Sequence, residues 1–211
     1  MLRNLLAIRS TLLIEQVCPL CRRVSDGTTA GPCLCSQCCS ALALPRHGCR
    51  GNQPLPWWSL GTYSGDFRHC LLRLKRAGSG RILTALLNGL QPLLPSCSTG
   101  WLVPIPSWKR RRANPLPAQI AAGLGRVKPH LLQRTRAGVG QHRLNRQQRL
   151  MNLQGAFQSP ASAEALELWL VDDILTTGAT ALAAREALTT AGHRVRGLIC
   201  LARTPAQGNG R

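Results

Sequence analysis

The chain has 211 residues, 44% of them hydrophobic, which is enough for one substantial core and one small additional unit. It carries 27 lysines and arginines against 8 aspartates and glutamates, so its formal net charge is +19. This charge leaves little room for cationic partners and indicates an anionic one: a nucleotide, a phosphorylated sugar or nucleic acid. The alternative is that the arginines only form a solvated surface.

The N-terminal segment reads MLRNLLAIRSTLLIEQVC, and its apolar residues are interrupted by Arg3, Arg9 and Glu15. It therefore lacks the continuous apolar centre of a secretory signal, and no other segment approaches the ~20 apolar residues of a membrane span. A transit peptide is the alternative, but the cysteines that begin at Cys18 leave little to remove. We expect a short helix here, and a cytoplasmic protein with no membrane span.

Seven of the ten cysteines lie between Cys18 and Cys49, which indicates that they serve one local structural element. Cys18 and Cys21 form one C-x-x-C pair, and Cys35 and Cys38 form a second. Two such turns can complete a tetrahedral Zn²⁺ site, and paired C-x-x-C turns are its usual spacing. Disulfides, which a cytoplasmic location disfavours, an iron–sulfur cluster and free thiols are the alternatives to zinc.

The remaining cysteines of this stretch, Cys33, Cys39 and Cys49, make the ligand set less obvious. Cys35 and Cys38 are preferred because they alone repeat the two-residue spacing of the first pair. Four protein ligands leave no open coordination position, so the zinc is expected to be structural. It would allow ~40 residues, too few for a core of their own, to fold.

Beyond the cysteines, the pattern alternates between strands and helices. The segment 51–56 is a polar linker, SLGTY a short strand, and DFRHCLLRLKRAG a helix with apolar residues at helical spacing. A second helix spans 81–90, WLVPIP is a strand that its prolines terminate, and PLPAQIAAGLG is a helix with a glycine stop. The predicted units are a helix and zinc element in 1–50, a linker and helical segment in 51–100, an α/β core in 101–203, and a disordered tail in 204–211.

The C-terminal third contains LELWLV, then ATALAAREALTTAG, then VRGLICLA. These predict a strand, a helix and a strand, which form a βαβ unit of a parallel sheet flanked by helices, an α/β fold. Asp172 and Asp173 follow the first strand directly. Ligands of parallel α/β sheets bind beyond the carboxyl ends of the strands, so these acids are candidate ligand contacts.

The turn that follows them, TTGAT, opens the helix with Thr176, Thr177, Gly178, Ala179 and Thr180. Unpaired backbone N–H groups and the helix dipole favour an anion there, the hydroxyls add donors, and glycine permits a close backbone approach. Carboxylates beside a phosphate repel it unless they hold something else. A ribose diol at sugar-length distance from its own 5′-phosphate fits this pattern, whereas an N-capped structural turn with two chance aspartates is the alternative.

The stretch VDDILTTGAT resembles the phosphoribosyl diphosphate (PRPP) motif of type I phosphoribosyltransferases. The whole chain, from Cys18 to about Arg203, resembles the ComF family, in which a cysteine-rich zinc element precedes a phosphoribosyltransferase-like domain. The motifs that follow in the order of that family are CPLC, CSQC, LKRAG, VPIPSWKRR, RTRAGVGQHRLNRQQRLMNLQGAF and VDDILTTGAT. The resemblance implies that the paired acids hold the ribose 2′ and 3′ hydroxyls and that the turn holds the 5′-phosphate.

The resemblance also implies a pyrophosphate loop at VPIPSW, where Ser107 and Lys109 can meet anionic oxygens. The positions of the family's flexible loop fall on Arg134, Arg136, Gln141, Arg149 and Asn152. One stretch departs from the pattern, because residues 111–115 read RRANP where many relatives read Arg-Gly-Phe-Asn-Gln. No residue that would bind a base can be assigned.

Two functions follow from these residues. The first is an enzyme that binds PRPP or a ribose 5-phosphate nucleotide with Mg²⁺ and transfers the phosphoribosyl group, with release of pyrophosphate toward the basic loops. The second, which the ComF resemblance implies, is a non-catalytic accessory protein of DNA uptake in natural transformation. It would bind single-stranded DNA or a DNA-uptake helicase, but it offers few aromatic side chains for stacking apart from Trp57 and Trp58.

Overall fold

The structure is a computed structural model that describes residues 16–24, 31–77, 80–95, 100–107, 113–135 and 155–205. The predicted N-terminal helix and most of the predicted tail lie outside these ranges. No helix in the described ranges is long and apolar enough to cross a membrane.

A central sheet has the strand order β1-β2-β8-β6-β3, with β7 pairing with β8. Its strands are β1 (Cys49–Gly51), β2 (Trp57–Thr62), β3 (Trp101–Pro104), β6 (Glu167–Val171), β7 (Ile174–Leu175) and β8 (Arg194–Arg203). Only the pair β1–β2 is antiparallel, and every other pair is parallel. A separate two-stranded antiparallel sheet joins β4 (Gln133–Arg134) to β5 (Phe157–Gln158).

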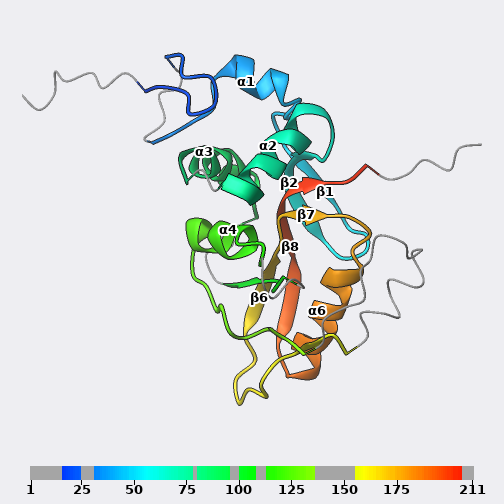
Figure 1. Cartoon of the computed structure of the whole chain (residues 1–211). Coiled ribbons are helices and arrows are strands. Elements are labelled where there is room, and N and C mark those ends of the chain that lie inside the picture. Colours follow the sequence, from blue (N-terminus) through cyan, green and yellow to red (C-terminus); the bar gives the residue numbers. More distant parts are fainter. Residues whose placement is uncertain are drawn as a thin grey trace, which may run out of the picture.

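Helices cover both faces of the central sheet (Figure 1). They are α1 (Ser36–Ala41), α2 (Gly65–Ala77), α3 (Gly80–Leu90), α4 (Leu116–Leu124) and α6 (Ala179–Thr190), with a short 3₁₀ turn, η2 (Gln91–Leu93), after α3. One apolar cluster packs α2, α3 and α4 against Leu102, Trp169 and Ile199, while a second packs α6 against Leu168 and Leu198. The expectation of an α/β fold with a mostly parallel sheet flanked by helices is therefore confirmed.

The strands β6 and β8 are apolar on both faces because each lies between two layers of helices. Leu168 to Val171 and Leu198 to Ala202 are buried without a break, as is typical of strands in the interior of a parallel sheet. The predicted βαβ unit is thus present as β6, α6 and β8. It places Asp172 directly after β6, at the carboxyl end of that strand.

The strand β2 lies between β1 and β8 in the central sheet, although its sequence follows a segment that reads as a linker. It packs there through Trp58, whose ring meets that of Trp169 edge-on, with 5.3 Å between the centroids. Gly197 of β8 provides the space, because a Cβ atom there would lie 3.0 Å from the Trp58 ring and 3.1 Å from the Trp169 ring. Three strands are locked together by this contact.

His193 lies in the turn between α6 and β8 and is only 4% exposed. Its Nδ1 accepts a hydrogen bond from the backbone N–H of Leu166 at 3.4 Å, and its buried Nε2 has no partner among the described residues. Burial lowers the pKa of His193 below its ordinary value of 6.5. The fold therefore holds the neutral imidazole.

We expect the free energy of unfolding to fall as the pH drops below about 6.5, because the unfolded chain then binds a proton at His193 that the native state excludes. The contribution is present above pH 6.5 and is lost between that pH and the lower pKa of the folded state. Urea unfolding of the parent and of His193→Asn between pH 7.5 and 5.5 measures it. The asparagine keeps an acceptor but does not titrate, so an equal pH dependence in both proteins would contradict this assignment.

Candidate functional site

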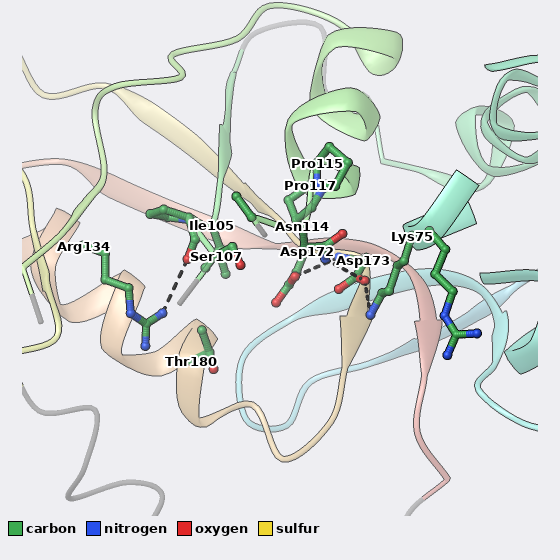
Figure 2. A pocket seen from close by; sticks show the side chains of 13 residues that line it. Lys75, Ile105, Ser107, Asn114, Pro115, Pro117, Arg134, Asp172, Asp173 and Thr180 are labelled. Atoms are coloured by element: carbon green, nitrogen blue, oxygen red, sulfur yellow. Dashed lines mark hydrogen bonds and ion pairs between the residues drawn. The ribbon is translucent and has the colours of Figure 1, made fainter. Parts of the chain in front are cut away.

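A cleft of about 810 Å³ opens at the carboxyl ends of β3 and β6. Among the polar residues that line it are Lys75, Ser107, Asn114, Arg134, Asp172 and Asp173. They come from the end of α2, the segment after β3, the segment before α4, the strand β4 and the end of β6 (Figure 2). The position agrees with the rule that ligands of parallel sheets bind beyond the strand ends.

Asp172 is half-buried and faces this cleft. Its backbone N–H donates to Ile199 O at 3.0 Å, which fixes the residue to β8, and its Oδ1 accepts a hydrogen bond from the N–H of Asp173 at 2.8 Å. Burial raises the pKa of Asp172 well above its ordinary value, and the adjacent charge of Asp173 raises it further. A cation or hydrogen-bond donors in the cleft would therefore stabilise the charged form of Asp172.

Asp173 is buried and its carboxylate is held by three groups of the chain. Its Oδ1 accepts the N–H of Ile174 at 2.9 Å. Its Oδ2 accepts from Asn114 Nδ2 at 3.0 Å and lies 2.5 Å from Lys75 Nζ (Figure 2). The carbonyl of Asp173 also accepts the N–H groups of Leu201 and Ala202 from β8. This acid is thus a junction between three segments that are far apart in the sequence.

Asn114 has a second contact, because its Oδ1 accepts the N–H of Leu116 at the start of α4, at 3.3 Å. It stands at the asparagine position of the Arg-Gly-Phe-Asn-Gln pattern, from which the chain departs at residues 112, 113 and 115. The stretch 111–115 therefore retains a side chain that contacts Asp173. Residues 111 and 112 lie outside the described part of the chain.

Arg134 approaches the acid pair from the side opposite to Lys75 (Figure 2). Its Nη1 donates to Pro106 O at 3.4 Å, and its guanidinium lies 4.8 Å from the centre of the Phe157 ring. Burial lowers the pKa of Arg134, and the charge of Asp172 opposes that lowering. The two acids thus lie between two cations.

The turn from Thr176 to Thr180 adjoins the cleft. Thr180 lines it; Thr176 is exposed, and its carbonyl accepts a hydrogen bond from the guanidinium of Arg203. Thr177 Oγ1 accepts the N–H of Ala179 at 3.5 Å. Among these five predicted contacts, only Thr180 is part of the cleft lining in this structure.

Gly178 is required for the fold itself. Its φ of +81° lies in the left-handed region, and a Cβ atom there would collide with the ring of Pro54. Glycine is therefore needed at this position to bring the loop before β2 against the turn. A valine at Gly178 would disturb this packing, so it would not test phosphate binding alone.

Several predicted contacts lie outside the described residues, namely Lys109, Arg136, Gln141, Arg149 and Asn152. Conversely, the prediction missed Lys75, Arg76 and Asn114, all of which line the cleft. The motif LKRAG contains the first two, but the sequence indicates no contact for either of them. A lysine that ends a helix gives no local sign of which distant carboxylate it will meet.

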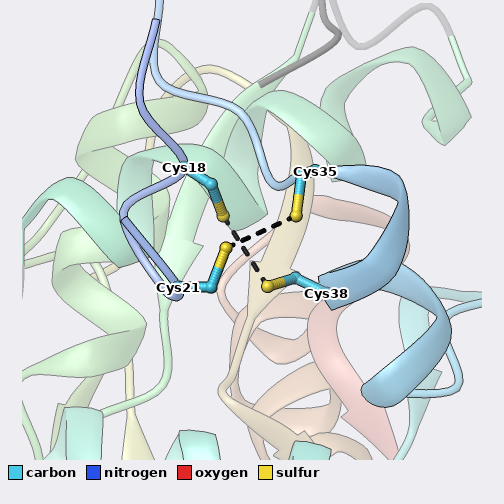
Figure 3. A group of neighbouring side chains, drawn as sticks. All are labelled: Cys18, Cys21, Cys35 and Cys38. Carbon is cyan, nitrogen blue, oxygen red and sulfur yellow. Dashed lines mark hydrogen bonds between the residues drawn. The ribbon is translucent and has the colours of Figure 1, made fainter. Parts of the chain in front are cut away.

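The four cysteines of the two C-x-x-C pairs come together away from the cleft, and their thiols point to a common centre (Figure 3). All four Sγ atoms lie within 4.8 Å of one another, with 3.7 Å between Cys18 and Cys38 and 3.6 Å between Cys21 and Cys35. Four sulfur ligands at ~2.3 Å from one tetrahedral ion would lie ~3.8 Å apart, whereas a disulfide needs ~2 Å. The arrangement fits a single four-coordinate metal ion.

The thiols compete for ionisation in the absence of a cation. Burial raises the pKa of Cys18, but backbone N–H groups of Cys21, Cys35 and Leu20 lower it to about 6. Burial raises the pKa of Cys38, and the neighbouring thiols raise it further. The Cys18 thiol thus ionises readily, while the Cys38 thiol resists ionisation. A metal ion at the centre would favour the thiolate form of all four cysteines.

The neighbouring cysteines have other surroundings. Cys39 Sγ donates to Leu34 O at 3.9 Å, and Cys33 Sγ lies 4.0 Å from Gln16 Oε1. Cys49 lies in β1, with its Sγ 4.0 Å from Thr62 Oγ1. The structure therefore selects the set Cys18, Cys21, Cys35 and Cys38.

No family model matches the chain. It is 28% identical over 208 residues to the DNA utilization protein YhgH of Salmonella typhimurium, which covers 89% of this chain and 90% of the relative. It is also 28% identical over 212 residues to the DNA utilization protein YhgH of Escherichia coli K12, with the same coverage of both chains. The likeness covers most of the chain, and its extent means that it includes the residues that line the cleft.

Proposed function

We propose that this chain acts in DNA utilization by binding single-stranded DNA. The observation that carries the proposal is the similarity, over nearly the whole chain, to proteins named for DNA utilization. That similarity supports the DNA role more than it supports phosphoribosyl transfer. The charge agrees, because no aspartate or glutamate occurs between Asp66 and Glu164, a stretch rich in arginine.

One surface of that stretch combines charge with an aromatic ring. Trp101 begins β3, with the guanidinium of Arg126 3.9 Å and the ammonium of Lys128 4.4 Å from the ring centre. Hydrogen bonds between Leu102 and the segment of Arg126 and Lys128 hold both cations along the sheet edge. The indole would hold the two cations in place, and phosphates would contact them.

A second proposal concerns the cleft, which we infer binds PRPP or a ribose 5-phosphate nucleotide. It rests on Asp172, which is half-buried in the cleft near Arg134, and on Thr180 at the start of α6. The acids would accept the ribose hydroxyls, and the turn before α6 would take the 5′-phosphate. A Mg²⁺ ion, if the Asp172 carboxylate held it through water, would neutralise part of the charge of the diphosphate.

In a transfer reaction, the bond between C1′ and the diphosphate oxygen would break, and the oxygen would leave with the electron pair. The acceptor nucleophile would supply the new bond to C1′. We infer that Ser107 and Arg134, which line the cleft, would stabilise the departing pyrophosphate together with Lys109, Arg136 and Arg149, which lie outside the described residues. The acceptor, a base or an amine, is left open.

We propose that the metal of the cysteine cluster is a structural Zn²⁺. Four thiolates around one tetrahedral ion leave no coordination position for a substrate. The cluster lies in a segment whose buried residues are mainly Cys18, Cys35 and Cys38, which form a small core of their own. A metal ion would supply the stability that so few apolar residues cannot.

Metal analysis of protein prepared anaerobically should find about one zinc ion per chain. Cys18→Ser and Cys38→Ser should lose the metal together with the fold of residues 18–49, which nuclear magnetic resonance can follow. Cys39→Ser is the matched control, since Cys39 lies next to Cys38 on α1 but outside the four-sulfur set. Iron, no metal, or equal loss in the control would each contradict the site.

Fluorescence anisotropy with a labelled single-stranded oligonucleotide should show binding at low salt that weakens steeply as the salt concentration rises. Replacing Arg126 and Lys128 together by serine should weaken binding about 10-fold and reduce the slope against salt concentration. The control replaces Arg73 and Arg81 of α2 and α3, which removes the same charge elsewhere. If the parent does not bind DNA at low salt, the DNA proposal is wrong. If both double variants lose the same amount of affinity, the DNA does not bind specifically at Arg126 and Lys128.

Isothermal titration with PRPP and Mg²⁺ tests the cleft. Asp172→Asn should weaken the binding of PRPP about 10-fold or more, because hydrogen bonds to charged groups contribute about 1.5 to 3 kcal/mol each. Asp66→Asn is the matched control, an exposed acid of α2 outside the cleft. No heat with PRPP or any nucleoside monophosphate in the parent, or equal binding by Asp172→Asn, would exclude the proposal.

A further inference from the structure

The two adjacent aspartates differ sharply in what surrounds them. The Asp173 side chain is only 7% exposed, and its two oxygens accept from one backbone N–H, one amide and one ammonium group. Asp172 is half-buried and faces the cleft with Arg134 nearby. A ligand that entered the cleft would find Asp173 occupied by the chain and Asp172 within reach.

We propose that Lys75 and Asn114 are positioning residues that hold Asp173, so that Asp172 is the acid of the pair that meets a sugar hydroxyl. The inference rests on the proposed binding of a phosphorylated ribose in this cleft. It departs from the expectation that both acids hold the diol. It gives the acids unequal roles, with Asp173 as the anchor and Asp172 as the ligand contact.

The physical reason is the cost of a buried charge. A carboxylate as buried as Asp173 keeps its place only when a cation and hydrogen-bond donors satisfy it, and Lys75 from α2 and Asn114 from the segment before α4 supply them. Without the ammonium group, the Asp173 carboxylate would lose its charged partner and the backbone at the end of β6 would be held less firmly. The Asp172 carboxylate is fixed to that backbone, because the backbone N–H of Asp173 donates to Asp172 Oδ1.

Lys75 could instead touch the ligand directly, since its side chain is 28% exposed in the cleft. The two roles differ in which ligands they affect. A direct contact to phosphate would matter for any phosphate, whereas a lysine that acts through the acids matters only for a ligand with hydroxyls. The experiment therefore compares ribose 5-phosphate with inorganic phosphate.

Isothermal titration of the parent, Lys75→Met, Lys75→Arg and Asp172→Asn with these two probes decides between the roles. Lys75→Met should weaken the binding of ribose 5-phosphate about 5-fold and leave the binding of inorganic phosphate unchanged. The affinity of Lys75→Arg for both probes should stay within about 2-fold of that of the parent. In the Asp172→Asn background, Lys75→Met should have no further effect, because the acid through which it acts is gone. Arg73→Met, a charge removed from the same helix outside the cleft, should match the parent.

Asn114→Ser gives an independent variant if Lys75→Met does not fold. Serine keeps an acceptor for the N–H of Leu116 but has no amide to donate to Asp173, so it should also weaken ribose 5-phosphate and spare phosphate. Thermal unfolding, read by circular dichroism, identifies which variants are folded under the conditions of the titration.

The outcomes separate this inference from the proposal on which it rests. If the folded parent binds neither ribose 5-phosphate nor PRPP, both the proposed function of the cleft and this inference are wrong. If the parent binds but Lys75→Met and Asn114→Ser bind like it, only the division of roles falls. Additive losses in the double variant, or equal weakening of inorganic phosphate, would make Lys75 a direct ligand contact and overturn its positioning role.

Discussion

The buried carboxylate of Asp173 is the constraint on which the cleft depends. A charge with so little access to water must be paired, and its partners come from α2 and from the segment before α4. The same residue is bound through its carbonyl to β8. Removing Lys75 would leave this charge uncompensated in the interior, and removing Asn114 would cost it a hydrogen bond, so the contacts of Asp173 tie the walls of the cleft to the end of β6.

The same electrostatic reasoning applies at the cysteine cluster, where groups that repel one another when ionised are also held close together. In both places the polypeptide brings groups that can carry negative charge to within a few ångströms of one another; Lys75 meets Asp173 in the cleft, and the four thiols fit one metal ion. The helix α2 lies between them, because Leu42, just after α1, packs in the apolar cluster beneath α2, while Lys75 near the end of α2 reaches the cleft. The cysteine element and the cleft therefore share a structural support.

Local patterns were sufficient to predict part of this arrangement. The βαβ unit follows from two apolar runs around an amphipathic segment, and the four-sulfur set follows from the repeated two-residue spacing of cysteines. The acids at the end of β6 were predicted because their position depends only on where that strand stops. In each case the signal and the structure lie within the same short stretch of chain.

The contacts between distant segments could not be predicted in this way. Neither Lys75 nor Asn114 carries a local sign of its partner, and the place of β2 in the central sheet depends on pairing with a strand at the other end of the chain. Gly178 was predicted to serve a phosphate, but its conformation and its contact with Pro54 give it a role in packing. Side-chain function at long range requires the tertiary structure, since periodicity reports only which face of an element is buried.

The contact between Trp58 and Trp169 gives the central sheet an optical signature. Two indole rings whose centroids are 5.3 Å apart and whose planes are inclined at 75° couple their strongest electronic transitions, which adds a pair of bands to the circular dichroism in the far ultraviolet. The signal exists only while β2 and β6 both lie against β8 at Gly197. Spectroscopy of this pair would thus distinguish unravelling of the sheet from changes confined to the cysteine element, which contains no tryptophan.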